Sequence, residues 1–197
     1  MRRTVRYLTH PQVRIDPDLD IPLWSLNDVG QQRVTALAAS GALAGTTSVT
    51  SSGETKALET AEPLAAALGC KVQVRALMHE NDRSATGFLP PEEFEQVADA
   101  FFAEPERSVR GWETAAEAQA RIVREFETCI ADHGRGDLLL VGHGGVGTLL
   151  YCHLSGQPIS REHDQGPGGG GCYFECDMDR LTPRTGWQPM EFLYSEG

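Results

Sequence analysis

Two histidines are the side chains of this 197-residue chain best suited to chemistry. His10 lies in the tripeptide Thr9-His10-Pro11, and His143 is followed by two glycines. A neutral imidazole can attack phosphorus in line and form a covalent phosphohistidine, which water later cleaves. Phosphoryl transfer otherwise needs positioning and stabilisation of charge on the phosphoryl oxygens, to which a donating second imidazole can contribute. A single histidine is more often structural, so the hypothesis depends on both histidines lying in one site.

Both histidines follow segments that predict β-strands. Residues 3–8 (RTVRYL) read as a short strand, and Pro11 ends it because proline cannot donate to a ladder. Residues 138–141 (LLLV) form a continuous apolar run, which is typical of a strand buried on both faces of a parallel sheet. Ligands of such sheets bind beyond the carboxyl ends of the strands, which is where both histidines would lie.

Strand-like and helix-like segments alternate through the first three-quarters of the chain. Further strands are expected at residues 48–51 and 72–74, with β-like segments at 173–177 and 190–194. Helices are expected after Asn27, at about 55–68, from Pro91, from Thr114 and at about 146–154. This alternation predicts one α/β domain over residues 1–197, with a mainly parallel central sheet and helices on both faces.

Several segments, in one order, resemble the signatures of the histidine phosphatases, a family that includes cofactor-dependent phosphoglycerate mutases. The family opens with a strand and Arg-His-Gly, where this chain has Thr9-His10-Pro11. Residues 26–32 (LNDVGQQ) resemble the start of its first helix, and residues 51–61 (SSGETKALETA) align without a gap to its Ser-Ser-Pro-x-x-Arg-Ala-x-x-Thr-Ala stretch. Residues 77–80 (LMHE) resemble its acid-bearing element, and residues 141–145 (VGHGG) resemble its second-histidine motif.

The resemblance covers about residues 4–150 and implies a phosphoglycerate mutase-like three-layer sandwich. It also implies a role for each matching residue. His10 would be the nucleophile, with His143 beside it and Glu80 as the general acid, which requires a raised pKa. Asp82 is the alternative acid. The expected phosphate-binding residues are Thr9, Lys56, Arg14 and Gly144, with the Gly145 N–H as a further donor.

Two departures from the family pattern concern phosphate binding. Thr9 and Lys56 stand where the family has arginines, and lysine cannot fork onto two phosphate oxygens as arginine does. One charge–charge contact is worth roughly 4 kcal/mol at about 4 Å and an effective dielectric constant near 20. We therefore expect another cation to replace the arginine at Thr9, with Arg14 favoured and Arg83 as the other choice.

Structural interpretations of the same residues stay open at this point. Residues 142–145 could form only a tight strand-to-helix turn. Lys56 could be a solvated helix residue paired with Glu54 or Glu59, and Glu80 could be an ordinary surface acid.

The formal net charge of −11 bears on the class of partner. Nucleic-acid and anionic-membrane binders need basic faces, so we expect neither partner. The five cysteines are odd in number and form no CxxC pair, which favours free thiols in a reducing cytoplasm. No apolar run reaches the ~18 residues of a membrane span, and no zinc-binding pattern such as HExxH occurs. A cytoplasmic protein without metal or cofactor is expected, and a homodimer is compatible with the sequence.

These patterns predict a metal-independent phosphomonoester hydrolase of the histidine acid phosphatase type, acting through a phosphohistidine on a small phosphorylated metabolite. Its activity would be weak if nothing replaces the arginines. One alternative is a phospho-ligand binding protein that kept the fold and lost turnover, motivated by Thr9 and Lys56. A phosphoglycerate mutase-type phosphotransferase is the other, less favoured because such mutases are usually longer.

Overall fold

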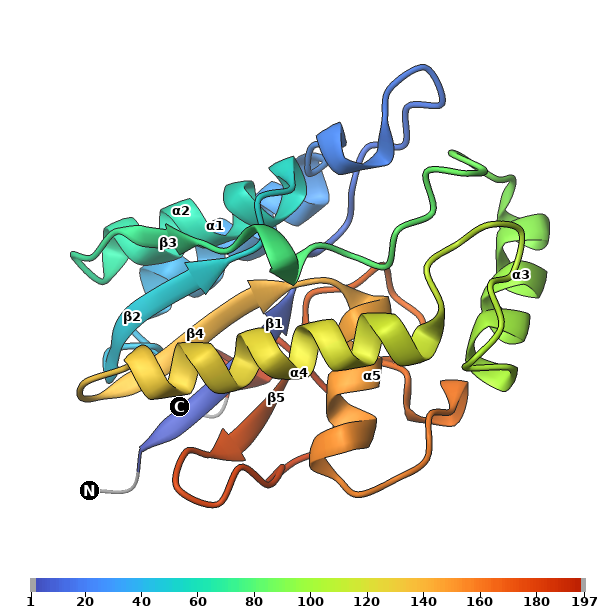
Figure 1. The fold of residues 1–197 in the computed structure, drawn as a ribbon. Coiled ribbons are helices and arrows are strands. Elements are labelled where there is room, and N and C mark those ends of the chain that lie inside the picture. Colours follow the sequence, from blue (N-terminus) through green and yellow to red (C-terminus); the bar gives the residue numbers. More distant parts are fainter. Residues whose placement is uncertain (1–2, 196–197) are drawn as a thin grey trace.

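The computed structural model of the chain describes residues 3–195, whose strands form a central β-sheet (Figure 1). The strands are β1 (Thr4–Thr9), β2 (Thr46–Ser51), β3 (Val72–Val74), β4 (Asp137–Gly142), β5 (Cys172–Asp177) and β6 (Gln188–Pro189). They lie in the order β3-β2-β4-β1-β5-β6. The first four are parallel, whereas β5 and β6 are antiparallel to their neighbours. The prediction of a mainly parallel sheet is confirmed.

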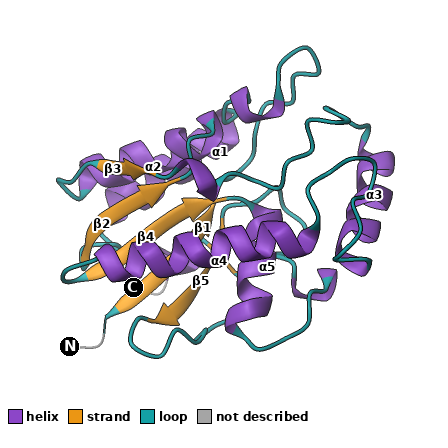
Figure 2. Ribbon diagram, in the orientation of Figure 1, coloured by secondary structure: helices purple, strands orange, loops and turns teal. Residues whose placement is uncertain are grey.

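Helices cover both faces of this sheet, as predicted (Figure 2). The helices are α1 (Asp28–Ser40), α2 (Thr55–Ala67), α3 (Pro91–Ala103), α4 (Ala115–Asp132), α5 (Gly144–Leu154) and α6 (Phe192–Ser195). Leu139 and Val141 of β4 pack with α1 and α2, whereas Leu138 and Leu140 pack with α4 and α5. Alternate side chains of one buried strand therefore serve two apolar cores, which explains why the strand is apolar throughout.

Side-chain caps explain where two of the helices begin. The Asn27 side chain accepts a hydrogen bond from the Gly30 N–H, so α1 starts at the next residue. Thr114 and Glu117 form a reciprocal capping box at the start of α4. Gly41 ends α1 with a φ of 73°, a left-handed conformation that favours glycine. These signals were readable in the sequence, and these helices form where they were expected.

The end of the chain differs from its predicted structure. Residues 190–194 were expected to be β-like, but the chain forms the short strand β6 and then the one-turn helix α6. Met190 is fully buried, whereas Phe192 is 51% exposed. Short apolar runs do not distinguish a strand from a helical turn, which accounts for this error.

Two further observations concern the chain as a whole. All five cysteines are free thiols, as predicted. Within residues 3–195, none of the helices has the length and apolar character that crossing a membrane would require.

Candidate active site

Strand pairing places His10 and His143 in one site. Strands β1 and β4 are parallel neighbours with Thr9 opposite Gly142, so the residues that follow them lie side by side. The His10 N–H donates to the Gly142 carbonyl at 3.0 Å. The two imidazole rings then lie 5.3 Å apart between centroids, with their planes inclined by 67°. The adjacency expected from two strand ends is therefore present.

Local contacts fix the protonation of His10. Its Nδ1 lies 2.9 Å from the Pro11 carbonyl oxygen, which can only accept, so Nδ1 carries the hydrogen and Nε2 keeps its lone pair. Burial, reinforced by His143, lowers the pKa of His10 to about 3. The residue still keeps part of its surface accessible. His10 is thus a neutral imidazole with a free nitrogen, the form that a nucleophile requires.

His143 is held through its other ring nitrogen. Its Nε2 lies 2.7 Å from the Ser52 Oγ, which also accepts the Glu54 N–H at 3.1 Å. A hydroxyl has one hydrogen and two lone pairs, so this contact fits either tautomer of His143. Burial lowers the pKa of His143, although the carboxylates of Glu54 and Glu80 oppose this. Its Nδ1 is buried without a partner among the described residues, next to His10.

Tyr7 fixes the backbone of this segment. Its hydroxyl accepts the His143 N–H at 3.1 Å and donates to the His143 carbonyl at 3.2 Å. A Cβ at Gly142 would lie 2.3 Å from the Tyr7 hydroxyl, and one at Gly147 would lie 2.6 Å from its ring. These two glycines therefore make room for a buried tyrosine that positions His143, a role that the sequence did not reveal.

Lys56 is buried, in contrast to the solvated alternative, but its charge is neutralised. Its exposed fraction is 3%, and its Nζ donates to the Ile21 carbonyl at 2.9 Å and to Glu54. Burial opposes ionisation of Glu54, yet His143 and Lys56 lower the pKa of its carboxyl to about 2. The expected phosphate-binding cation is therefore paired with Glu54, one of the two partners that the structural interpretation named, but in a buried position.

Glu80 differs from the expected general acid. Its carboxylate accepts the N–H groups of Gly145 at 3.0 Å and Val146 at 2.8 Å, at the start of α5, and that of Asn81 at 3.1 Å. Burial opposes ionisation, but His143, Arg83 and these amides hold the pKa of Glu80 below its ordinary value. The expectation of a raised pKa was wrong, because His143, Arg83 and the amides at the N-terminus of α5 together stabilise the anion.

Of the two backbone N–H groups that were expected to bind phosphate, those of Gly144 and Gly145, the contacts of Glu80 occupy one. The Gly145 N–H is occupied by Glu80, whereas the Gly144 N–H has no recorded partner among the described residues. Asp82, the alternative acid, is exposed and accepts the Ser84 N–H at 2.9 Å. Hydrogen bonds from Ser84 lower its pKa, so it is also ionised at neutral pH.

The remaining predicted phosphate ligands lie apart from one another. Thr9 is buried, and its hydroxyl is bonded to Gln165 at 2.6 Å rather than directed at an open site. Arg14 is exposed and lines a separate surface depression with Asn27 and Glu59, so its expected role in place of the missing arginine stays a prediction that this position does not support. Arg83 lies within electrostatic reach of Glu80 and His143 and lines a cavity that Glu80 also lines, with its guanidinium 5.0 Å from the Phe94 ring centre.

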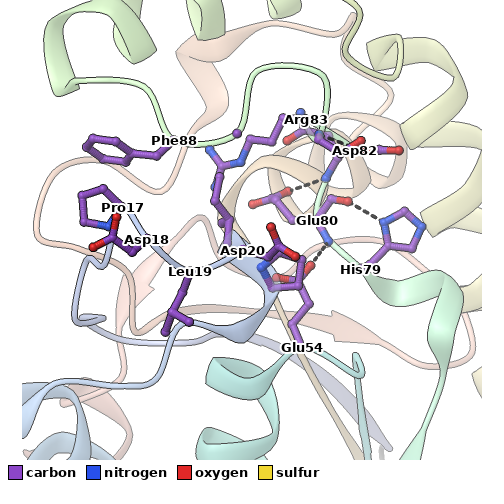
Figure 3. Close-up of a pocket in the computed structure, with 15 residues that line it drawn as sticks. Pro17, Asp18, Leu19, Asp20, Glu54, His79, Glu80, Asp82, Arg83 and Phe88 are labelled. Carbon is purple, nitrogen blue, oxygen red and sulfur yellow. Dashed lines mark hydrogen bonds between the residues drawn. The ribbon is translucent and has the colours of Figure 1, made fainter.

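That cavity has a volume of about 490 Å³ and lies between two segments, residues 17–22 and residues 79–88 (Figure 3). Glu54 and Glu80 connect it to the histidines, since the Glu54 carboxylate lies 3.5 Å from the His143 Nε2. Five carboxylates and one arginine line it: Asp18, Asp20, Glu54, Glu80, Asp82 and Arg83. An anion entering here therefore meets a mostly negative wall, and its own binding groups must be local.

A glycine-rich loop supports His10 from the far end of the chain. The Gly171 N–H donates to the His10 carbonyl at 3.0 Å, and Arg33 donates to the carbonyls of Gly170 and Gly171. A Cβ at Gly170 would lie 2.2 Å from the His10 carbonyl oxygen. The close approach of this loop shows that it positions the backbone of His10.

Comparison with known proteins identifies the family of the chain and its fold. The sequence model of the Histidine phosphatase superfamily (branch 1) matches residues 9–174, past residue 150, where the resemblance seen in the sequence ended. Similar solved structures include Bacillus stearothermophilus YhfR, with a TM-score of 0.78, 18% identity and coverage of 93% of this chain and 95% of that one.

Two further structures show the same fold. The mycobacterial glucosyl-3-phosphoglycerate phosphatase bound to inorganic phosphate has a TM-score of 0.73 and 21% identity, covering 94% of each chain. The alpha-ribazole phosphatase from Shigella flexneri has a TM-score of 0.72 and 16% identity, covering 91% of this chain and 93% of that one. None of the curated proteins compared with the sequence matches it significantly. With 166 consecutive residues matched from residue 9 to residue 174, the chain belongs to branch 1 of the histidine phosphatase superfamily.

Proposed function

We propose that this protein hydrolyses phosphomonoesters through a phosphohistidine formed on His10. The observation that supports this most strongly is the pair of neighbouring imidazole rings, 5.3 Å apart between centroids. His10 keeps an unprotonated Nε2, and the Nδ1 of His143 is buried without a partner among the described residues. In this proposal that Nδ1 carries the hydrogen of the His143 ring. A nucleophile next to an unused donor is the arrangement that phosphoryl transfer needs.

The reaction proceeds in two displacements. The His10 Nε2 attacks phosphorus, the P–N bond forms, and the P–O bond to the alcohol breaks with its electron pair on the leaving oxygen, which takes up a proton from solvent water. A water molecule then attacks the phosphohistidine, the P–N bond breaks with its electron pair on Nε2, and the proton that this water loses returns to solvent, leaving phosphate and the neutral imidazole. The His143 Nδ1–H and the Gly144 N–H stabilise the phosphoryl oxygens during both steps.

The source of the leaving-group proton limits which substrates react well. In the free site, hydrogen bonds and nearby charges hold both Glu54 and Glu80 as carboxylates. A carboxyl that stays ionised is a poor acid for an alkoxide, so we expect leaving groups that need little protonation to react fastest.

The cavity of about 490 Å³ suits a small phosphorylated metabolite. Two of the similar structures carry the names glucosyl-3-phosphoglycerate phosphatase and alpha-ribazole phosphatase, which supports a phosphorylated metabolite as the class of substrate. The proposal includes turnover without a metal ion and a cytoplasmic location.

A binding protein without turnover is the second candidate. The observation that favours it is the buried Lys56–Glu54 pair, which leaves the site without the free cation expected at that position. Such a protein would bind phosphate and show no hydrolysis.

Hydrolysis of p-nitrophenyl phosphate at about pH 5–8, with and without EDTA, separates these functions. We expect EDTA-resistant turnover that His10→Ala removes. The matched control is His153→Ala, because His153 is exposed on α5, and this variant should keep full activity. Loss of turnover with EDTA would indicate a metal enzyme, and phosphate binding without turnover would favour the binding protein.

A further inference from the structure

We infer that the side chain of Gln165, oriented by Thr9, supplies the phosphate donor that arginine supplies at the position of Thr9 in related proteins. This inference rests on the proposed function, because it assigns a ligand to the same phosphate site. No sequence motif marks Gln165, which lies in the loop between α5 and β5. Its position follows from four contacts.

Thr9 holds the acceptor end of the Gln165 amide. The Thr9 hydroxyl accepts the Cys172 N–H at 3.0 Å and donates to the Gln165 Oε1 at 2.6 Å. This hydroxyl has a single hydrogen and two acceptors in reach, the Gln165 Oε1 at 2.6 Å and the Cys172 carbonyl at 3.2 Å, and the nearer acceptor takes it. With Oε1 occupied in this way, the NH₂ group of the amide faces away from Thr9.

The donor end of the amide lies at the start of α5. The position of a Cβ at Gly144 would be 2.4 Å from the Gln165 Nε2, so this nitrogen lies directly against the backbone that follows His143. No partner of the Gln165 Nε2 or of the Gly144 N–H is recorded among the described residues. Both residues keep part of their surface accessible. Two donors, the Gln165 Nε2 and the Gly144 N–H, therefore lie next to the residue whose Nδ1 is the third donor in the proposed function.

The loop that carries Gln165 is tied to the same helix. The Asp164 Oδ1 accepts both the Gln165 N–H at 2.7 Å and the Thr148 hydroxyl at 3.0 Å, and Thr148 lies within α5. This anchor fixes the backbone, and Thr9 fixes the far end of the side chain. The amide is therefore pre-organised, which reduces the entropy lost when a ligand binds.

Thr9 and Gln165 together thus place a donor where an arginine at position 9 would place its guanidinium. The donor that they supply is neutral. Hydrogen bonds to charged groups are worth more than neutral ones, and a guanidinium offers two donors to one phosphate, whereas the amide offers one or two from a single nitrogen. The site gains a hydrogen bond to the phosphoryl group without gaining a positive charge.

The test measures binding of inorganic phosphate by calorimetry and hydrolysis of p-nitrophenyl phosphate. Gln165→Glu keeps the shape and the acceptor for Thr9 but replaces the donor by a negative charge. We expect it to weaken phosphate binding and to lower kcat/KM about a hundredfold, and Gln165→Ala to lower both about tenfold. Gln157→Glu is the matched control, since Gln157 is exposed just beyond α5, and it should leave both quantities unchanged.

A rescue experiment separates phosphate binding from a structural role. Thr9→Arg in the Gln165→Ala background should restore at least half of the lost affinity, because it rebuilds a phosphate donor in the space that Gln165 vacates. Thermal unfolding should show Gln165→Ala to be folded. Wild-type affinity in a folded Gln165→Glu variant, or failure of Thr9→Arg to rescue, would overturn the inference.

The readouts also keep the two proposals apart. If the wild-type protein binds phosphate but neither hydrolyses esters nor forms a phosphohistidine, the proposed function fails. Selective loss of phosphate binding in Gln165→Glu would then still support the role of Gln165.

Discussion

At the scale of single residues, the site histidines differ in which ring nitrogen their neighbours occupy. A carbonyl holds the Nδ1 of His10, and a hydroxyl holds the Nε2 of His143. The first contact leaves the Nε2 lone pair of His10 free, and the second leaves the Nδ1 of His143 without a partner among the described residues. The proposed function gives these two identical side chains opposite roles. Both contacts are compatible with neutral imidazole rings. Two positively charged rings 5.3 Å apart would repel each other.

Gly144→Ala is a second test of whether the Gln165 Nε2 and the Gly144 N–H bind phosphate. The new methyl group would displace the Gln165 amide, which is the flexible end of a side chain, so the fold should lose less than about 1 kcal/mol of stability. Phosphate binding should weaken because one donor is moved and access to the Gly144 N–H is narrowed. Thermal unfolding together with phosphate calorimetry measures both effects. Unchanged phosphate affinity would contradict the assignment.

Glu80→Gln distinguishes a general acid from a helix-capping carboxylate. Because its low pKa keeps Glu80 ionised, we expect the variant to lose turnover by a similar factor for nitrophenyl and alkyl phosphates, as α5 and His143 lose an anionic partner. Steady-state kinetics on both ester types measures this. A loss confined to the alkyl esters would restore the acid role expected from the sequence.

At the scale of elements, the glycine-rich loop before β5 packs against the loop after β1 and holds its backbone at His10. Gly166 and Gly170 have nearly the same φ, 83° and 84°, so alanine at either position has the same left-handed strain of about 1–2 kcal/mol. At Gly170 the methyl group would in addition press on the His10 carbonyl, whereas Gly166 has open space.

Gly170→Ala should therefore lose most of its turnover, and Gly166→Ala, its matched control, should lose stability alone. Activity per folded molecule, corrected by the unfolding curve of each variant, is the measurement. Equal activities of the two variants would mean that the loop does not position His10.

How much of this structure the sequence predicts depends on how far apart along the chain the interacting residues lie. Asn27 and Thr114 cap helices through hydrogen bonds to residues three positions away, so the sequence predicted where α1 and α4 begin. The apolar run of β4 likewise predicted a buried strand. The histidine pair was predicted because parallel strands end at one edge of the sheet.

Contacts that join distant segments could not be read in the same way. Gln165 meets Thr9 across 156 positions of the chain, and the Glu80 carboxylate reaches the amides of α5 across 65 or 66. Nothing local in the sequence marks such pairs, and Arg14 was chosen for its closeness to His10 along the chain rather than in space. The errors in the site therefore concern partners, whereas the fold was predicted from patterns within elements.

At the scale of the whole molecule, net charge and the cavity wall act in the same direction. The chain carries a formal charge of −11, and five carboxylates but a single arginine line the cavity. A dianionic substrate is repelled at long range, and salt screens this repulsion, because the Debye length falls from about 30 Å at 0.01 M to about 8 Å at 0.15 M.

Raising NaCl over that range should therefore increase kcat/KM for p-nitrophenyl phosphate several-fold, with little change in kcat. Steady-state kinetics at constant pH measures this, and a neutral additive of equal osmolality serves as the control. A decrease in kcat/KM with salt would show that local cations dominate the approach of the substrate.

The central claim is that His10 becomes phosphorylated, and trapping that intermediate tests it most directly. Purified protein is mixed with a radiolabelled phosphomonoester, quenched in alkali, and digested for mass spectrometry. We predict an acid-labile, alkali-stable phosphoryl group on the peptide that contains His10, absent from His10→Ala and retained in His153→Ala. Hydrolysis of the ester without any label on His10, or label that persists in His10→Ala, would contradict the account.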